Sequence, residues 1–431
     1  MRPNLPAAVE IPRRKVRIGQ LSSHRGLMHD VSQVKPTQSG RRQPLNAIIV
    51  PTARRADQMI RAIRLAADAE TTLVVLGSQQ STIDEVAAHV AKIPGSRALI
   101  VDVPAAYLHP YLTPSASSNA ARRLSAGRDS DLSLKRNIGL LLARLLGWNK
   151  IMFLDDDVTV KDAEDLTKLA SQLDGTQVAG LLCRQFPDNS VVCHANRLRG
   201  EKQDVFLTGA ALGVNCADQP LPFFPDIYNE DWFFFFGHAA HGRLPAVGTA
   251  MQRRYDPFGD PDRARREEFG DILAEGLYAL ISTGLDLSVA GRSYWEAFSS
   301  ARQSLIEDIA ANLRDRLDSN ENLQALRSME AAAEQAGLIT PDDCVEFIQA
   351  WQDNRRVFEH AAARIGNVGS FADAFDFLEL PNWRAAAFAN TDLSRMPSVL
   401  EFSRGRDHGR SAGRGAPPSV PSSPATAAAS L

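Results

Sequence analysis

The chain has 431 residues, of which 44% are hydrophobic, and its formal net charge is −3. This length allows two or three domains with a sizeable core, and the nearly balanced charge argues against a protein that binds nucleic acid or a membrane surface as a whole. Its four cysteines are irregularly spaced, which indicates a reduced protein rather than a disulfide scaffold. No apolar run is long enough to span a bilayer and no signal peptide is evident, so we expect a cytoplasmic protein.

Strands and helices alternate in the first part of the chain, after a polar, basic arm (1–43) that we expect to be disordered. Strands are expected at 45–50, 71–76 and 97–103, with a helix after each of the first two. This alternation predicts a parallel, doubly wound α/β sheet. The segment 104–130 has no clear period, and a loop of this length is usually functional or mobile.

The most informative stretch runs from Ile151 to Val158, where an apolar run leads directly into Asp155, Asp156 and Asp157. Such a run predicts a buried strand, central in the sheet. Ligands bind outside the carboxyl ends of strands in open α/β sheets, and Mg²⁺ is usually held by one or two carboxylates plus substrate phosphates. We therefore expect a metal–phosphate site here; the alternative is an acidic turn in which one aspartate caps the next helix.

Geometry ranks the three aspartates. In an extended segment, Asp155 and Asp157 project to the same side and Asp156 to the other. We therefore expect Asp155 and Asp157 to meet the metal, although a turn at this point would reverse the order.

A second pair of carboxylates lies at Glu230 and Asp231. Asn229 is a plausible helix N-cap, which would place both acids in the first turn of a helix. The apolar run from Trp232 to Phe236 would raise the pKa of a neighbouring carboxylate by desolvation, as suits a general base. The alternative is that the two acids only complement the helix dipole.

Further elements follow the long loop. Helices are expected at 131–147 and 162–173, and strands at 177–183, 206–214 and 244–251. Beyond about residue 262 the chain reads as helices, at 269–281, 295–317, 322–336, 342–362 and 370–378. We thus divide the chain into the arm 1–43, an α/β domain 44–261, a helical region 262–403 and a disordered tail 404–431.

Four motifs, in this order, resemble those of GT-A-fold glycosyltransferases, in particular the large family 2 group. They are Val50-Pro51-Thr52-Ala53-Arg54-Arg55, Lys135-Arg136-Asn137-Ile138-Gly139, Phe153-Leu154-Asp155-Asp156-Asp157 at the DxD position, and Asn229-Glu230-Asp231-Trp232 at the ED position. The resemblance covers roughly 45–260, and its order is more specific than any single motif. It implies a GT-A (nucleotide-diphospho-sugar transferase, Rossmann-like) domain followed by a mostly helical C-terminal region.

The resemblance also implies roles. Asp155 and Asp157 would hold Mg²⁺ or Mn²⁺ against the diphosphate of a nucleotide-sugar donor, and Arg136 would add to the stabilisation of the leaving group. Asp231, with Glu230 beside it, would deprotonate an acceptor hydroxyl for inverting displacement. The other residues expected at the donor are Pro51, Thr52, Arg54, Ser78 and Asp156.

Several features remain open under this resemblance. The third metal ligand would be Asp256, with His238 and His241 behind it. Where many members of the family place an aspartate that holds the base, this chain reads Leu76-Gly77-Ser78-Gln79, so the nucleotide is not specified. The acceptor is equally unspecified, and the region 262–403 would cover the acceptor site, mediate a homodimer, or both.

Other functions fit parts of the pattern. The string Asp155-Asp156-Asp157-Val158-Thr159 matches the Asp-x-Asp-x-Thr motif of haloacid-dehalogenase-type phosphatases, with Asp155 as nucleophile, although that motif normally opens its domain. A non-catalytic sugar-nucleotide-binding protein is a third interpretation. A zinc site would have to use Cys183, Cys193, His194 and Cys216, which lack any Cys-x-x-Cys spacing.

Overall fold

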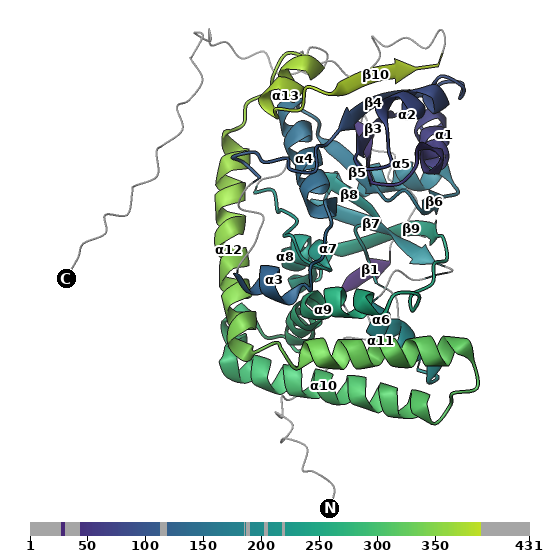
Figure 1. Ribbon diagram of the computed structural model, residues 1–431. Coiled ribbons are helices and arrows are strands. Elements are labelled where there is room, and N and C mark those ends of the chain that lie inside the picture. Colours follow the sequence, from purple (N-terminus) through teal and green to yellow (C-terminus); the bar gives the residue numbers. More distant parts are fainter. Residues whose placement is uncertain are drawn as a thin grey trace, which may run out of the picture.

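The computed structural model describes residues 27–30, 44–112, 119–184, 186, 190–201, 206–217 and 220–388. Most of the predicted basic arm and the whole predicted tail therefore lie outside the described residues. Within them, the chain forms an α/β domain followed by a helical C-terminal region, as predicted (Figure 1).

A mixed ten-stranded sheet forms the centre of the α/β domain, in the order β1-β9-β7-β8-β5-β2-β3-β4-β10, with β6 paired to β9. The strands are β1 (Met28–Asp30), β2 (Ala47–Thr52), β3 (Thr72–Gly77), β4 (Arg97–Asp102), β5 (Lys150–Leu154), β6 (Val158–Val160), β7 (Val178–Arg184), β8 (Ala211–Asn215), β9 (Leu244–Gln252) and β10 (Trp383–Ala387). The strand that leads into the three aspartates, β5, lies in the middle of this order, as its apolar sequence predicts.

The direction of some strands differs from the prediction of a parallel sheet. Strands β4, β3, β2 and β5 are parallel, but β8 runs antiparallel to β5, with Leu212 opposite Phe153. β6 and β10 are antiparallel to their partners as well. All five residues of β8 are buried, like those of a parallel strand, so its hydrophobic pattern carries no signal of its direction.

Helices cover both faces of the sheet, so the doubly wound arrangement is confirmed. The helices α1 (Ile60–Asp68), α2 (Ile83–Val90) and α5 (Ala163–Gln172) contribute to one buried cluster, which also contains Ile48 and Val50 of β2. Ala47 and Ile49, the alternate residues of β2, belong to the cluster on the other face together with α4 (Leu132–Leu145). Successive side chains of a strand point to opposite faces, which divides the core in this way.

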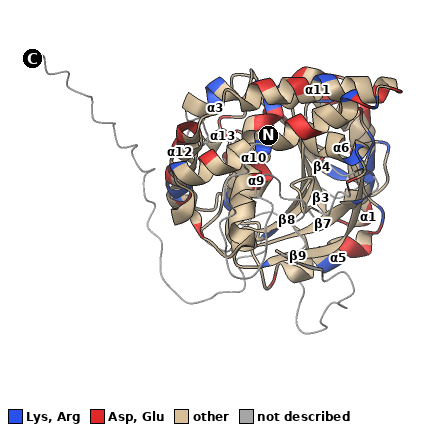
Figure 2. Ribbon diagram, turned by 90° about the horizontal axis from the view of Figure 1, so that it is seen from below, with Lys and Arg blue, Asp and Glu red and all other residues tan. Residues whose placement is uncertain are grey.

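The helical region packs on the face that carries α4. It consists of α9 (Pro261–Ser282), α10 (Arg292–Arg314), α11 (Asn320–Ala336), α12 (Pro341–Arg364) and α13 (Phe371–Phe377). Phe233 of α7 (Glu230–Phe234) packs edge-on against Phe347 and Trp351 of α12, and one hydrophobic cluster spans the sheet and these helices. Charged residues occur mainly in the outer helices and much less in the strands (Figure 2). No helix among the described residues is both long and apolar enough to cross a membrane.

Several short elements were not predicted. These are β1, β6, β10, α3 (Asn119–Leu124) within the expected long loop, α6 (Val191–Leu198) and α8 (Phe236–Ala240). β10 pairs antiparallel with β4, so that the chain returns from the helical region to the edge of the sheet (Figure 1). Segments of three to eight residues are too short for a clear hydrophobic period, and contacts with distant parts of the chain decide their structure.

Candidate active site

The candidate site lies at the ends of the central strands of the sheet, on the side where the parallel strands have their carboxyl ends. The carboxyl ends of β2, β3 and β5 lie there, and so does the amino end of the antiparallel β8. The backbone N–H of Asp155 donates to the carbonyl of Ala210 over 2.9 Å, which joins the end of β5 to the segment before β8. Residues from four segments are thereby brought together, although they are far apart in the sequence.

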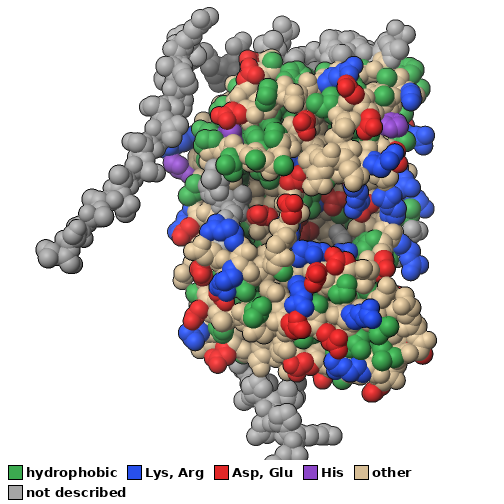
Figure 3. Space-filling model, viewed as in Figure 1, with side chains coloured by type: hydrophobic (Ala, Val, Ile, Leu, Met, Phe, Trp, Pro, Cys, Tyr) green, Lys and Arg blue, Asp and Glu red, His purple; other side chains and the backbone are tan. Residues whose placement is uncertain are grey.

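Two adjoining cavities open at these strand ends. The Asp156 cavity, of about 480 Å³, is lined by Pro51, Thr52, Ala53, Arg54, Ser130, Asp131, Leu132, Asp155, Asp156, Asp157, Gln252, Tyr255, Asp256 and Arg263. The Asp231 cavity, of about 270 Å³, contains Arg128, Arg136, Glu230, Asp231 and Trp232 in its wall, and Ser130, Leu132 and Asp155 line both cavities. The space-filling view shows acidic and basic side chains side by side around a hollow in the middle of this face (Figure 3).

The side chains of the three aspartates do not project alternately to the two sides of an extended segment. A turn begins immediately after β5, and the N–H of Val158 donates to the carbonyl of Asp155 over 3.1 Å. Arg54 Nη1 lies 2.6 Å from Asp156 Oδ1 and 2.9 Å from Asp157 Oδ2, so these two carboxylates face the same guanidinium. Asp155 instead faces Arg136. The chain leaves the extended conformation at this point, so Asp156 and Asp157 converge on Arg54, while all three carboxylates line the same cavity. The expected metal pair of Asp155 and Asp157 stays a prediction.

Burial and mutual repulsion act on the aspartates. Burial raises the pKa of Asp155, and Asp157 adds to this, although Arg136 lowers it. Burial likewise raises the pKa of Asp156, against the hydrogen bond from Thr52 Oγ1 (2.6 Å) and the charge of Arg54. Both carboxylates thus carry a cost of ionisation that a further cation would reduce.

The donor atoms around Asp156 and Asp157 fit a hard divalent cation. Two carboxylate oxygens, one from each residue, converge on a single cationic nitrogen of Arg54, which is the arrangement that a metal ion would need. Among the described residues, no group of three or more His, Cys, Asp or Glu side chains is placed to hold a metal. Two carboxylates suffice for Mg²⁺ when phosphate oxygens complete its shell. The Arg54 side chain is 52% exposed and is free to turn outward.

The expected third ligands differ in their placement. Asp256 lines the Asp156 cavity, and its Oδ1 accepts from the N–H of Phe258 over 2.9 Å. His238 does not line either cavity: its Nε2 lies 3.0 Å from Gln177 Oε1, just before β7. The strands β7 and β5 run in the same direction, so the amino end of β7 is on the opposite side of the sheet from the carboxyl end of β5 and from the aspartates. His238 is therefore wrongly predicted as a ligand. His241 also lies outside both cavities, with Nδ1 2.6 Å from the carbonyl of Gly237.

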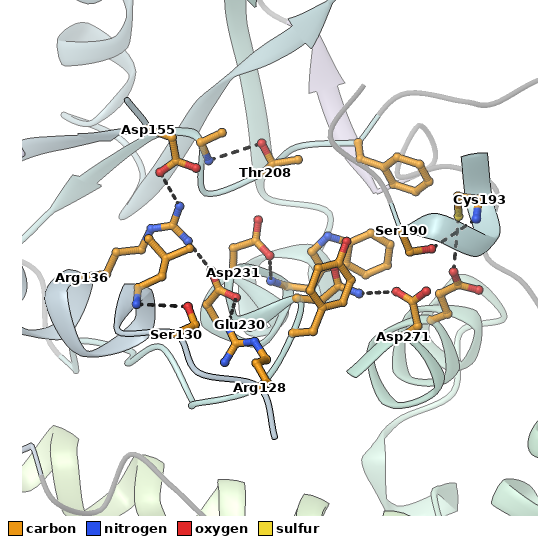
Figure 4. A pocket seen from close by; sticks show the side chains of 17 residues that line it. Arg128, Ser130, Arg136, Asp155, Ser190, Cys193, Thr208, Glu230, Asp231 and Asp271 are labelled. Carbon is orange, nitrogen blue, oxygen red and sulfur yellow. Dashed lines mark hydrogen bonds and ion pairs between the residues drawn. The ribbon is translucent and has the colours of Figure 1, made fainter. Parts of the chain in front are cut away.

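Arg136 connects the two cavities. Its Nη2 donates to Asp155 Oδ1 over 2.8 Å and its Nη1 to Glu230 Oε1 over 2.5 Å, as Figure 4 shows. The side chain is fully buried; burial lowers its pKa, but the charges of Asp155 and Glu230 raise it more, so the guanidinium stays protonated. A Cβ at Gly209 would lie 2.6 Å from Nη1, so only glycine lets the backbone pass this close.

Asp231 is held by backbone amides. Its Oδ2 accepts from the N–H of Gly209 over 2.5 Å and its Oδ1 from the N–H of Trp232 over 2.9 Å, and the residue is only 8% exposed. Glu230 pairs with the guanidinium of Arg136, whereas the carboxylate of Asp231 accepts from two backbone N–H groups and lines the Asp231 cavity. Asn229 precedes them in a left-handed conformation (φ 63°).

Asn229 occupies the predicted N-cap position, and Glu230 and Asp231 lie in the first turn of α7, but the expected side-chain cap is not formed. The side chain of Asn229 instead donates to Asp271 Oδ1 over 2.7 Å. Asp271 and Glu275 of α9 both line the Asp231 cavity, and so does Arg128, whose Nη2 lies 4.0 Å from Glu230 Oε2. Nothing in the local pattern of these three residues indicated a site, because packing of α9 and of the loop before α4 places them there.

The remaining predicted residues and alternatives have clear positions. Pro51 and Thr52 line the Asp156 cavity, whereas Ser78 is buried beside it against Asp131 and Lys135. The suggested zinc residues have other neighbours: Cys193 contacts Glu275, Cys183 contacts Thr208, and His194 contacts Tyr255.

Comparisons with known proteins give only distant likenesses. No family model and no curated protein matches the chain. Among solved structures, the apo form of mouse xyloside xylosyltransferase 1 is 13% identical over 48% of this chain and 85% of that chain, with a TM-score of 0.30. The structure of A197 from STIV is 13% identical over 47% of this chain and 82% of that chain, with a TM-score of 0.27. Values this low do not bear on activity.

Proposed function

We propose that the protein is a metal-dependent glycosyltransferase that moves a sugar from a nucleotide-sugar donor to an acceptor hydroxyl, with inversion at the sugar carbon. The observation that carries this proposal is the placement of Arg136. This buried arginine joins Asp155, in the wall of the Asp156 cavity, to Glu230, next to Asp231. A charged site for a diphosphate and a candidate base are thereby held on the two sides of one guanidinium.

Each side chain has a definite task in such a reaction. Asp231 takes the proton of the acceptor hydroxyl, whose oxygen forms a bond to the anomeric carbon. The bond from that carbon to the phosphate oxygen breaks, and its electron pair leaves with the nucleotide diphosphate. Arg136 lies close enough to both steps to stabilise negative charge, and its two carboxylate partners hold it in place.

A divalent cation fits the carboxylates of Asp156 and Asp157, and Asp155 and Asp256 lie in the wall of the same cavity. When bound, it would supply charge neutralisation for the leaving diphosphate. Arg54 would have to give up its contacts with both carboxylates, which would free its guanidinium for the phosphates.

The test is a thermal-shift screen of nucleotide sugars with Mn²⁺, followed by a transfer assay with the donor that binds. Asp231→Asn is expected to keep donor binding and to lose transfer by about 10²–10⁴-fold, the usual contribution of a general base. Asp129→Asn is the matched control, because Asp129 is exposed. If no nucleotide sugar bound in the presence of Mn²⁺, the proposal would be wrong. Hydrolysis of an aryl phosphate that Asp155→Asn abolishes would assign a phosphatase instead.

A further inference from the structure

Three residues form a polar cluster at the wall of the Asp156 cavity: Asp131 lines the cavity, and Lys135 and Ser78 are buried behind it. Lys135 of α4 is 1% exposed, and its Nζ donates to the carbonyl of Thr52 and to Ser78 Oγ, each over 2.7 Å. Nζ also lies 2.7 Å from Asp131 Oδ2, and Ser78 Oγ donates to the same oxygen over 2.6 Å. Burial lowers the pKa of Lys135, against the charge of Asp131.

The cluster lies beside the aspartates along the carboxyl ends of the strands. The three aspartates follow β5 and Ser78 follows β3, and β2 lies between these two strands. Neighbouring strands are about 4.8 Å apart, so the ends of β5 and β3 are roughly 10 Å apart. Thr52 of β2 lies between the two groups: its Oγ1 donates to Asp156 Oδ2 over 2.6 Å, and its carbonyl accepts from Lys135 Nζ over 2.7 Å. Because Asp131 lines the same cavity as Asp156 and Asp157, a ligand whose diphosphate lay at these two residues could place its organic part within reach of Asp131.

Asp131 has the position of a helix cap but not its contacts. It precedes α4 directly, yet its side chain makes no capping bond. Its carboxylate is 30% exposed and lines the cavity, and both of its contacts, with Lys135 and Ser78, use Oδ2. Oδ1 takes part in neither. A carboxylate accepts hydrogen bonds only, so a ligand group that meets this oxygen must be a donor.

The neighbouring turns offer no other carboxylate at this end of the cavity. The turn after β3 reads Gly77-Ser78-Gln79, and Asp102, at the end of β4, is not among the residues that line the cavity. The acid at this end thus comes from the start of α4, and Lys135 fixes it there by a buried ion pair.

We propose that Asp131, positioned by Lys135 and Ser78, recognises the nucleoside end of the donor by accepting a hydrogen bond from a ribose hydroxyl or a base N–H. The inference rests on the proposed function, because it takes the ligand to be a nucleoside diphosphate. It makes Asp131 a determinant of nucleotide specificity, whereas the phosphates are bound elsewhere in the cavity.

Calorimetry with Mn²⁺ tests this on the full chain, with UDP, GDP, ADP, CDP and inorganic pyrophosphate as probes. The wild type is expected to bind one nucleotide more tightly than pyrophosphate. Asp131→Asn is expected to weaken the binding of that nucleotide by about ten-fold to a hundred-fold, the usual effect of losing a hydrogen bond to a charged group. The affinity for pyrophosphate should not change. An asparagine has one acceptor oxygen, which Lys135 and Ser78 would retain, so the ligand would meet an amide donor instead.

A second variant covers a failure of Asp131→Asn to fold. Asp131→Glu keeps the charge that Lys135 needs but moves the carboxylate, and it is expected to show the same selective loss. Asp129→Asn, at an exposed neighbour, should bind every probe as the wild type does. The 2′-deoxy nucleotide shows whether the ribose or the base donates the hydrogen bond. If the wild type binds the 2′-deoxy nucleotide as weakly as Asp131→Asn binds the ribonucleotide, and Asp131→Asn binds both equally, the ribose hydroxyl is the partner of Asp131.

The outcomes separate the two proposals. If both variants lost affinity for pyrophosphate and for the nucleotide to the same extent, Asp131 would have a structural role. This result would overturn the inference but not the proposed function. Unchanged nucleotide affinity in either folded variant would do the same. If the wild type bound neither pyrophosphate nor any nucleotide, the proposed function would fail and the inference with it.

Discussion

Two clusters in this protein each place three carboxylates near an arginine, but in very different surroundings. In the first, Arg54 holds Asp156 and Asp157, with Asp155 beside them, and the arginine is 52% exposed. In the second, Arg302 of α10 donates to Glu268, Asp271 and Glu275 of α9, and all four side chains are only 0–3% exposed.

The difference lies in what can replace the arginine. Arg302 is fully buried between α9 and α10 and holds all three carboxylates, so it cannot leave them for solvent as an exposed arginine can. The side chain of Arg54 is half-exposed, so under the proposed function we expect it to turn into solvent when a metal ion takes its place. Like compositions therefore give a buried ion cluster between helices in one case and a partly exposed cluster in the other, at which we expect a metal ion to replace the arginine.

The largest expected effect is on folding. Arg302→Ala would leave three buried carboxylates without their cation, and breaking a buried ion pair typically costs about 3–5 kcal/mol. We expect a loss of this size in the free energy of unfolding, measured by urea denaturation. Arg314→Ala, which removes an exposed pair with Glu330, should cost less than about 1 kcal/mol. Equal effects of the two variants would contradict the contrast between the clusters.

The next largest effect concerns metal binding. Asp157→Ala removes one of the two carboxylates that converge on Arg54, and we expect Mn²⁺-dependent nucleotide binding to weaken about 100-fold or more. Its melting temperature should stay close to that of the wild type, because Asp157 repels its neighbours as well as attracting Arg54. Calorimetry and thermal denaturation measure the two quantities. A large loss of stability with unchanged binding would make this cluster a structural one as well.

A third prediction concerns pH and the α9 acids. Burial raises the pKa of Glu268 to about 7 and that of Glu275 to about 8, although Arg302 lowers both. The folded state thus binds these protons more tightly than the unfolded state. Their contribution to stability is complete below the ordinary value of 4.5 and is lost as the pH rises through the folded values.

Stability should therefore fall between about pH 5 and pH 8, by at most about 1.4 kcal/mol per pH unit for each proton released. Glu275→Gln should flatten this slope, as measured by urea denaturation across the range. Glu330→Gln, at an exposed position, should leave it unchanged. A slope that is the same in all three proteins would show that the α9 acids do not titrate in this way.

The smallest expected effect concerns the replacement of Arg54 by a metal ion. Arg54→Gln removes the cation that a metal must displace, so the affinity of the free protein for Mn²⁺ should rise, by about three-fold to ten-fold for a partly exposed charge. Arg55→Gln is the matched control, since Arg55 is 79% exposed and pairs only weakly with Asp57, 3.6 Å away. Weaker Mn²⁺ binding in Arg54→Gln would show that the arginine supports the metal rather than competes with it.

The sequence by itself determined the parts that depend on local pattern. Alternating apolar runs predicted the strands and the helices on both faces, and the buried strand β5 was correctly placed in the middle of the sheet. The order of the acidic motifs indicated which residues to compare, and Asp155, Asp156, Asp157 and Asp256 do line one cavity. These features follow from hydrophobic period and from the rule that ligands bind at strand ends.

Tertiary structure decided the direction of side chains and of strands. The turn after β5 turned Asp156 toward Arg54, and the antiparallel β8 brought Gly209 to Asp231, neither of which a period can encode. His238 was misplaced because its distance from the site depends on how α8 packs. Asp131 took on its position only because Lys135 and Ser78, from another helix turn and another strand, meet it in space. Long-range contacts of this kind have no local signature in the chain.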